Sequence, residues 1–217
     1  MKRSQSGFTL IEIAIVLVII GLLLGGVLKG QELINSAKVK NLATDFRNIP
    51  VFIYGYQDKF KALPGDDSAA GSHVAATADG NGNGVINGMW DSVTAADESI
   101  IFWQHVRLAG LAPGETTVNF TTYLPTNAMG GRIGITNGTP TNLPITGLRG
   151  SYIICSGGIL GKFAKQLDVT LDDGNPATGS MMIMAEPVTH PATVAASPIA
   201  STALVDDATT YTVCMGV

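Results

Sequence analysis

GFTLIEIAIVLVIIGLLLGGVL, residues 7–28, is the most informative stretch of the sequence. Residues 8–28 carry one charged side chain, Glu12, and as a helix rising about 1.5 Å per residue they are roughly 31 Å long. That length crosses the hydrocarbon core of a bilayer. Lys2 and Arg3 precede the stretch, and the positive-inside bias keeps this end cytoplasmic and directs the following chain outward. The stretch therefore predicts one transmembrane helix.

Glu12 is the anomaly in this helix, because an ionised carboxylate inside a membrane costs on the order of 3 kcal/mol or more. No Lys or Arg lies within residues 8–28 to pair with it. A cut between Gly7 and Phe8 would create a free amino group at a suitable depth. That amine could meet the Glu12 of the same helix or of a staggered neighbour. The pattern predicts processing at Gly7 and Phe8 and a role for Glu12 in assembly.

The motif GFTLIE at residues 7–12, behind a short basic leader, resembles the processing signature of type IV prepilins and type II secretion pseudopilins. The resemblance implies that a prepilin peptidase cuts after Gly7 and methylates Phe8, and that Glu12 is needed for assembly. It implies a structural subunit of a helical filament, not an enzyme. Lys29 stands where many pilus-forming members have a helix-kinking proline, so pilin and pseudopilin both stay open.

Four segments follow from this interpretation. Residues 1–7 are a cleaved leader, 8–28 the transmembrane helix, 29–62 the outer half of the long helix, and 63–217 a globular α+β head. The expected location is the bacterial inner membrane with the head in the periplasm, and then a cell-surface pilus or periplasmic pseudopilus. The expected partners are the lipid bilayer, the prepilin peptidase, the inner-membrane assembly platform and other pilin or pseudopilin subunits.

Other interpretations of the N-terminus remain open. An ordinary secretory signal peptide would use residues 1–7 and 13–24, but no Ala-x-Ala-like cleavage site follows them. A plain single-pass anchor is the other alternative, and it would make the chain a membrane-anchored periplasmic protein that binds a small ligand. The Gly7 and Glu12 pair favours the filament subunit, because a simple anchor has no use for a carboxylate inside the membrane.

The rest of the chain predicts a pilin-like α+β fold, with the long helix packed on a small, mostly antiparallel sheet. A stripe with helical spacing predicts the face that packs on the head: Leu33, Ile34, Ala37, Leu42, Phe46, Ile49, Ile53, Tyr56 and Phe60. Pro50 predicts a kink or break in this helix. Strands are expected at residues 118–124, 132–136, 151–155, 181–185 and 211–215. Helices are expected at residues 95–109 and 158–167, and an Ala/Thr/Ser/Pro-rich loop at 186–210.

The strongest motif of the head is DGNGNGVI at residues 79–86, which matches the first half of an EF-hand-type loop. It predicts calcium bound by Asp79, Asn81, Asn83 and the carbonyl of Val85. Position 12 of the loop is Trp90, which cannot supply the usual bidentate carboxylate. The candidates for that ligand are Glu98, Asp91, Asp97 and Asp66. A glycine-asparagine turn without metal is the alternative, and the acidic turn at residues 171–176, with Asp172 and Asp173, is the second place for an ion.

Cys155 and Cys214 are the two cysteines, and in an exported head they predict one disulfide, with two buried thiols as the alternative. The net charge of −4 and the lack of a Lys/Arg cluster give no reason to expect nucleic acid as a partner. The serines fit no nucleophile motif, and His73 and His190 have no partner at catalytic or metal-ligand spacing. His105, on the helix expected at 95–109, is expected to be a packed or surface histidine and not a ligand. We expect no enzymatic activity.

Overall fold

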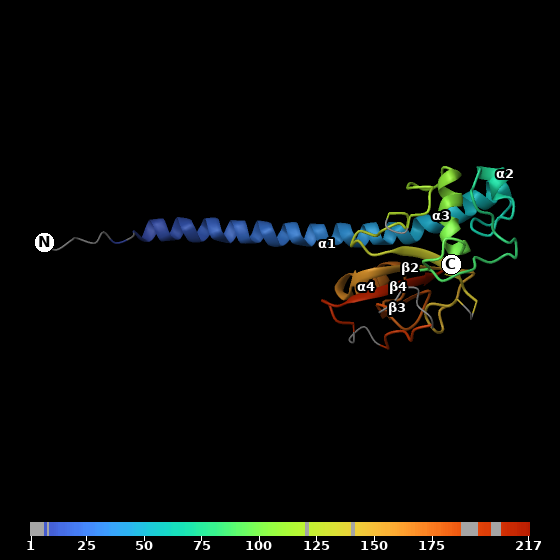
Figure 1. The fold of residues 1–217 in the computed structure, drawn as a ribbon. Helices are drawn as coiled ribbons and strands as arrows, with labels where there is room; N and C mark the ends of the chain where they lie inside the picture. The colour runs from blue at the N-terminus through green and yellow to red at the C-terminus, as the bar shows by residue number, and fades with distance from the viewer. Residues whose placement is uncertain (1–6, 8, 120–121, 140–141, 188–194, 201–204) are drawn as a thin grey trace. The chain divides into compact units, whose positions relative to one another are not determined.

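The computed structural model of the 217-residue chain describes residues 7, 9–119, 122–139, 142–187, 195–200 and 205–217. The chain divides into two compact units, Met1–Lys38 and Val39–Val217, here called the N-terminal unit and the C-terminal unit. The boundary falls inside the first helix, α1 (Leu10–Phe60), which is drawn from blue to cyan in Figure 1. Within the described residues the N-terminal unit consists of Gly7, Thr9 and the first part of α1.

Helix α1 runs without interruption for 51 residues and contains Pro50. Of the predicted kink or break at Pro50, the break is therefore wrong. A proline inside a helix costs about 3 kcal/mol, because it removes one hydrogen bond and crowds the preceding turn. Ile49 and Ile53, on either side of it, are 2% and 1% exposed, and burial of two such side chains offsets that cost. The helix ends at Phe60, and Lys61 adopts a left-handed backbone conformation with φ of 56°.

The outer part of α1 buries one face in the core of the C-terminal unit, as the stripe predicts. The buried residues of this face are Val39, Leu42, Ala43, Phe46, Ile49, Ile53 and Tyr56. Leu33 and Ile34, predicted to begin the stripe, are 62% and 58% exposed. They lie in the N-terminal unit, which contributes no residue to the hydrophobic clusters of the described chain.

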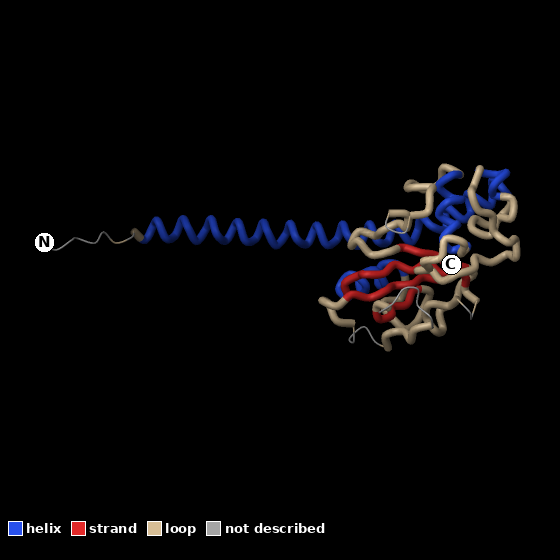
Figure 2. The backbone as a smooth tube through the Cα atoms, viewed as in Figure 1, coloured by secondary structure: helices blue, strands red, loops and turns tan. Residues whose placement is uncertain are grey.

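Four strands form one antiparallel sheet in the C-terminal unit, shown in red in Figure 2. They are β1 (Ile133–Asn137), β2 (Tyr152–Leu160), β3 (Met181–Ala185) and β4 (Thr210–Gly216), in the spatial order β1-β2-β4-β3. All four lie at or beside predicted strands. The α+β, pilin-like layout of a long N-terminal helix and a small antiparallel sheet is confirmed.

Three shorter helices complete the described elements: α2 (Ala70–Val74), α3 (Glu98–Leu108) and α4 (Gly161–Leu171). Helix α2 was not predicted. The predicted helix 95–109 begins before α3, and the predicted helix 158–167 begins before α4. Helix α4 starts later because β2 continues through a register shift between Ser156 and Ile159, where Gly158 has a φ of 67°.

The strand predicted at 118–124 is wrong for its described residues, which are irregular, while 120 and 121 lie outside the described residues. The predicted loop 186–210 is non-helical where described, with one isolated bridge at Ala196, and its residues 188–194 and 201–204 lie outside.

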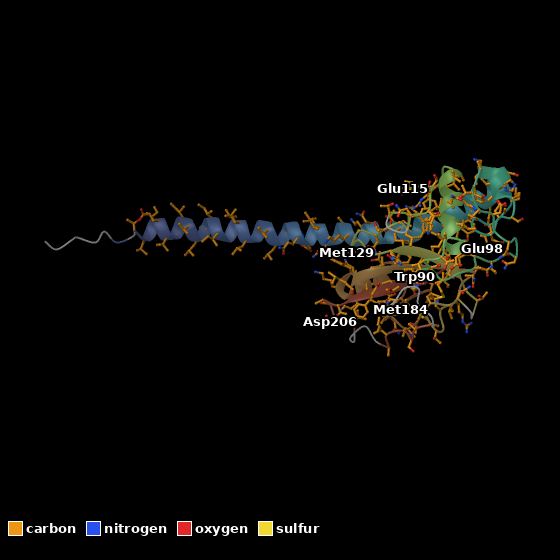
Figure 3. All side chains as sticks on the ribbon, viewed as in Figure 1. Trp90, Glu98, Glu115, Met129, Met184 and Asp206 are labelled. Atoms are coloured by element: carbon orange, nitrogen blue, oxygen red, sulfur yellow. A yellow bond between two sulfur atoms is a disulfide. The ribbon has the colours of Figure 1, made fainter. Side chains whose placement is uncertain are left out.

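The sheet separates two hydrophobic clusters, because alternate residues of a strand point to opposite faces. The larger cluster joins the outer part of α1, helix α3 and residues such as Ile154, Ile183 and Val213. The smaller cluster lies on the other face and contains Trp90, Ile145, Leu148, Ile153, Cys155, Met182, Met184 and Cys214. Trp90 and Met184 are labelled in Figure 3.

Candidate functional site

Gly7 lies before α1, is exposed, and is not part of a helix or strand. A Cβ built on Gly7 would have no atom within 4 Å, so the fold itself does not require glycine at this position. A requirement for glycine would therefore have to come from an enzyme that acts on the chain. Phe8, the predicted new N-terminus, lies outside the described residues, and processing stays a prediction.

Thr9 and Glu12 form a capping box at the start of α1. The Thr9 backbone N–H and side-chain hydroxyl both donate to Oε2 of Glu12, at 2.8 and 2.7 Å, and the Glu12 N–H donates to Oγ1 of Thr9 at 3.3 Å. The sequence reasoning missed this pair, although Thr-x-x-Glu is a known signal for a helix start. The capping box gives the Glu12 carboxylate hydrogen bonds but no positive charge.

The apolar part of α1 exposes its side chains on all sides. Among the described residues, one helix is long and apolar enough to span a membrane, with a mean hydropathy of 2.8 over its best 18 residues, none of them buried. Leu10 and Leu22, for example, are 93% and 73% exposed. Such a surface is stable only against lipid or other apolar helices. Lys29 and Glu32 form an exposed ion pair of 2.7 Å beyond it.

The side chains of the Asp79 loop accept hydrogen bonds from backbone amides, one in α2 and two in the loop itself. Oδ1 of Asp79 accepts from the Gly71 N–H at 2.7 Å. The amide oxygen of Asn81 accepts from the Asn83 N–H, and that of Asn83 from the Val85 N–H, each at 3.0 Å. The two asparagine bonds are Asx turns, and together the three bonds give each predicted side-chain ligand a donor within the protein.

Two predicted carboxylates do reach this loop. Oδ1 and Oδ2 of Asp66 accept from the Asn83 and Gly84 N–H groups at 2.9 and 2.7 Å. Glu98, labelled in Figure 3, is 5% exposed and accepts from the Asn81 and Asn87 N–H groups at 2.9 and 2.8 Å. Both carboxylates therefore hold the loop as acceptors of backbone hydrogen bonds. Calcium bound by Asp79, Asn81, Asn83, Val85 and Glu98 stays a prediction.

Asp91 and Asp97 were the other two candidates for the closing ligand, and Trp90 stands at position 12 of the loop. Trp90 is 1% exposed and belongs to the smaller hydrophobic cluster. Oδ2 of Asp97 accepts from the Ser92 hydroxyl at 2.5 Å, and Asp91 is buried. Among the described residues, the sole group of three acidic, His or Cys side chains whose ligand atoms lie within 4.8 Å of one another is at the second acidic turn: Asp168, Asp172 and Asp173. The sequence pointed to Asp172 and Asp173 but not to Asp168.

A buried network beside the Asp79 loop was also missed. Oδ2 of Asp67 accepts from the Tyr56 hydroxyl at 2.7 Å and pairs with Nδ1 of His73 at 2.7 Å. Burial raises the pKa of the Asp67 carboxyl, but the bonds from His73, the Ala69 N–H and Tyr56 outweigh that effect and lower it. The network ties α2 to α1, and His73 therefore has a partner that its sequence neighbours do not reveal.

His105 holds the same region from α3. Its Nδ1 accepts from the Gly65 N–H at 3.0 Å, so Nε2 donates to the Ala78 carbonyl at 2.9 Å. Burial lowers the pKa of this histidine and favours the neutral form that these two bonds require. Of the two predicted places for His105, packed or on the surface, the structure has it packed, with the side chain fully buried. His190 lies outside the described residues.

Cys155 and Cys214 form the predicted disulfide. They face each other across β2 and β4, the two central strands of the sheet, and both are fully buried. No cysteine of the chain is free. The bridge thus fixes the middle of the sheet and closes a long loop of the chain.

Asp45 gives a test of the electrostatics of α1 outside the membrane stretch. It lies beside Ile49, Phe52 and Trp103, and burial raises its pKa to about 6. A raised pKa means that the C-terminal unit is most stable where Asp45 is protonated and loses stability as pH rises through about 6. We expect Asp45→Asn to raise the free energy of unfolding by about 1–2 kcal/mol at pH 8, after allowance for partial exposure, and not at pH 4. Urea unfolding at both values checks this.

Asp58→Asn is the matched control for Asp45→Asn, because Asp58 is an exposed carboxylate of the same helix. It should leave stability unchanged within about 0.5 kcal/mol at pH 8. An equal gain from Asp45→Asn at both pH values would mean that ionisation is not the cause.

The comparison with known protein families bears on the N-terminus. Residues 2–28 match the family described as the prokaryotic N-terminal methylation motif. The search of curated proteins and the search of solved structures each gave no match. The matched residues include Gly7, Phe8 and Glu12, the positions that the sequence singled out. The chain therefore carries the prepilin-type methylation signature of type IV pilins and pseudopilins.

Proposed function

We propose that the chain is a structural subunit of a type IV pilus or a type II secretion pseudopilus. It is made as an inner-membrane precursor, loses residues 1–7, and joins a helical filament. The observation that carries this proposal is the carboxylate of Glu12 within an otherwise apolar helix start, in a segment that matches the methylation motif. A membrane anchor alone gains only a helix cap of about 1 kcal/mol from a charge that costs on the order of 3 kcal/mol inside the membrane.

The exposed apolar surface of α1 supports assembly with other pilin-type subunits. In a filament, the lipid that surrounds residues 10–28 in the membrane is replaced by the same segments of neighbouring subunits. Side chains such as Leu10 and Leu22 then pack against one another. An N-terminal amine created at Phe8 would give the Glu12 of a neighbour the positive partner that the capping box lacks. This pairing selects the register between subunits, because a carboxylate left unpaired in an apolar bundle is costly.

The C-terminal unit fits a non-catalytic role outside the cytoplasm. Lys2 and Arg3 keep the leader on the cytoplasmic side, which directs the C-terminal unit to the periplasm. The Cys155–Cys214 disulfide persists in that oxidising compartment. His73 pairs with Asp67, and His105 bonds to the Gly65 N–H and the Ala78 carbonyl. None of these hydrogen bonds is to a serine, threonine or cysteine side chain.

Intact-mass measurement of the membrane form tests the processing step. We expect the wild-type mature chain to begin at Phe8 and to carry one added methyl group. Gly7→Val should retain the leader, since glycine at this position serves the peptidase, while the fold leaves room for a larger side chain. Gly26→Ala is the matched control, because a Cβ at Gly26 also meets no atom within 4 Å, and it should be processed normally. Wild-type protein that keeps Met1, or that is cut near Gly26, would refute the proposal.

A further inference from the structure

A pocket of about 220 Å³ lies in the C-terminal unit, between the outer part of α1 and residues of α3 and β1. Its walls are largely apolar and include Ile49, Phe52, Trp103 and Ile133. Asp45 of α1 is the one charged residue that the described chain places among them. Ordinary small-molecule sites enclose roughly 300–1,000 Å³, so this pocket suits a molecule of about ten non-hydrogen atoms or fewer.

The Asp45 carboxylate lacks a positive partner among the described residues. Burial alone raises its pKa to about 6, and no hydrogen bond or charge from that part of the chain adds to this effect or offsets it. The side chains three and four positions away share its side of the helix, and all are uncharged: Asn41, Leu42, Asn48 and Ile49. No basic side chain of the same helix face therefore balances the charge of Asp45.

Arg107, the arginine of α3, is engaged elsewhere. Its Nε and Nη1 donate to the carbonyls of Pro113 and Glu115, at 3.1 and 2.8 Å. Its guanidinium also lies over the Trp103 ring, 5.7 Å from the ring centroid. None of these contacts is to Asp45, so a cation that balances Asp45 has to come from outside the described chain.

The charge of Asp45 destabilises the C-terminal unit when no ligand is present. A carboxylate whose pKa is raised by burial lowers the stability of the fold wherever it is ionised. Asparagine has nearly the same shape and would not have this effect. Titratable groups that are desolvated in a cleft, and that remain there at a cost to stability, are typical of binding sites. The unbalanced carboxylate therefore points to a ligand of opposite charge.

We propose that this pocket binds a small organic cation, a primary amine or guanidine on a short apolar body, and that Asp45 pairs with its charge. The apolar body lies against Ile49 and Phe52 and removes their surface from water. Phe52 and Trp103 add aromatic surface, on which organic cations bind favourably. Partial exclusion of water makes the pairing with Asp45 stronger than pairing with an exposed carboxylate. The site belongs to the C-terminal unit alone and does not depend on assembly into a filament.

Benzylamine is a suitable probe, because it is an ammonium on a single aromatic ring, and benzyl alcohol is its uncharged counterpart of nearly the same size. Full-length protein in detergent is titrated at pH 8, where Asp45 is ionised, and the fluorescence of Trp103 in the pocket wall is followed. We expect benzylamine to bind with a Kd on the order of 1 mM and benzyl alcohol at least about tenfold more weakly. Saturating benzylamine should also raise the midpoint of thermal unfolding by roughly 3 °C.

Asp45→Asn should weaken benzylamine binding at least about tenfold and abolish the shift in midpoint. This variant is expected to be more stable than the wild type at pH 8, so lost binding would not result from unfolding. Asp58→Asn removes an exposed carboxylate of the same helix and is the matched control, which should bind like the wild type. Equal binding of benzylamine to Asp45→Asn, equal affinity for benzyl alcohol, or no binding of benzylamine up to about 20 mM would overturn the proposal.

Discussion

Glu12→Ala should abolish filaments while the protein is still inserted and processed. Removal of the carboxylate eases insertion by on the order of 3 kcal/mol, so membrane levels should not fall. Loss of the Thr9–Glu12 capping box costs the start of α1 only about 1 kcal/mol. The proposed pairing with a neighbour's N-terminal amine is lost altogether. Immunoblots of sheared or periplasmic filaments, against the membrane fraction, measure the result.

Two further variants separate assembly from capping. Glu12→Gln keeps an acceptor for the Thr9 N–H but has no charge, and it should be as defective as Glu12→Ala. Thr9→Ala removes the hydroxyl from the capping box but keeps the charge, and it should still form filaments. The reverse pattern, with filaments in Glu12→Gln and none in Thr9→Ala, would show that Glu12 serves the helix start and not assembly.

The local patterns of the sequence were sufficient for the elements that depend on near neighbours. The run at 181–185 became β3 with the same bounds, because a run of five residues between Gly179 and Pro187 is too short for a helix and suits a buried strand. The run at 118–124 contains comparable residues, yet Tyr123 is used differently. Its hydroxyl donates to the Ile100 carbonyl at 3.0 Å, in a turn packed on α3. The local sequence allowed either a strand or a turn here, and contacts with α3 favour the turn.

The polar sites of the C-terminal unit were harder to predict because their partners are distant in sequence. Glu98 was a candidate ligand for the Asp79 loop, and it does reach that loop, but it accepts hydrogen bonds from backbone amides. Nothing in the composition of a Gly/Asn-rich loop tells which amides will point inward. Asp168 was missed because its burial depends on how α4 packs on the sheet. Its spacing of four residues before Asp172 was the available signal, since such residues share a helix face.

Reduction of the Cys155–Cys214 disulfide should destabilise the C-terminal unit by about 4 kcal/mol. The bridge spans a sequence separation of 59 residues, and the chain-entropy model assigns that cost to the greater freedom of the reduced unfolded chain. For a unit of this size, the loss corresponds to a fall of roughly 10 °C in the unfolding midpoint. Urea unfolding of residues 39–217 with and without reductant, followed by tryptophan fluorescence, measures the difference.

The variant Cys155→Ala/Cys214→Ala separates the effect on the unfolded chain from packing in the fold. Both sulfurs are buried in the smaller hydrophobic cluster with Trp90 and Met184, so their removal leaves cavities. The double variant should therefore be less stable than the reduced wild type by a further roughly 1–2 kcal/mol. Its midpoint should not respond to reductant. If thiol labelling shows that both cysteines of the wild type are free under reductant, yet its midpoint matches that of the oxidised protein, the bridge does not stabilise the sheet. In that case, packing between β2 and β4 alone would hold the two central strands together.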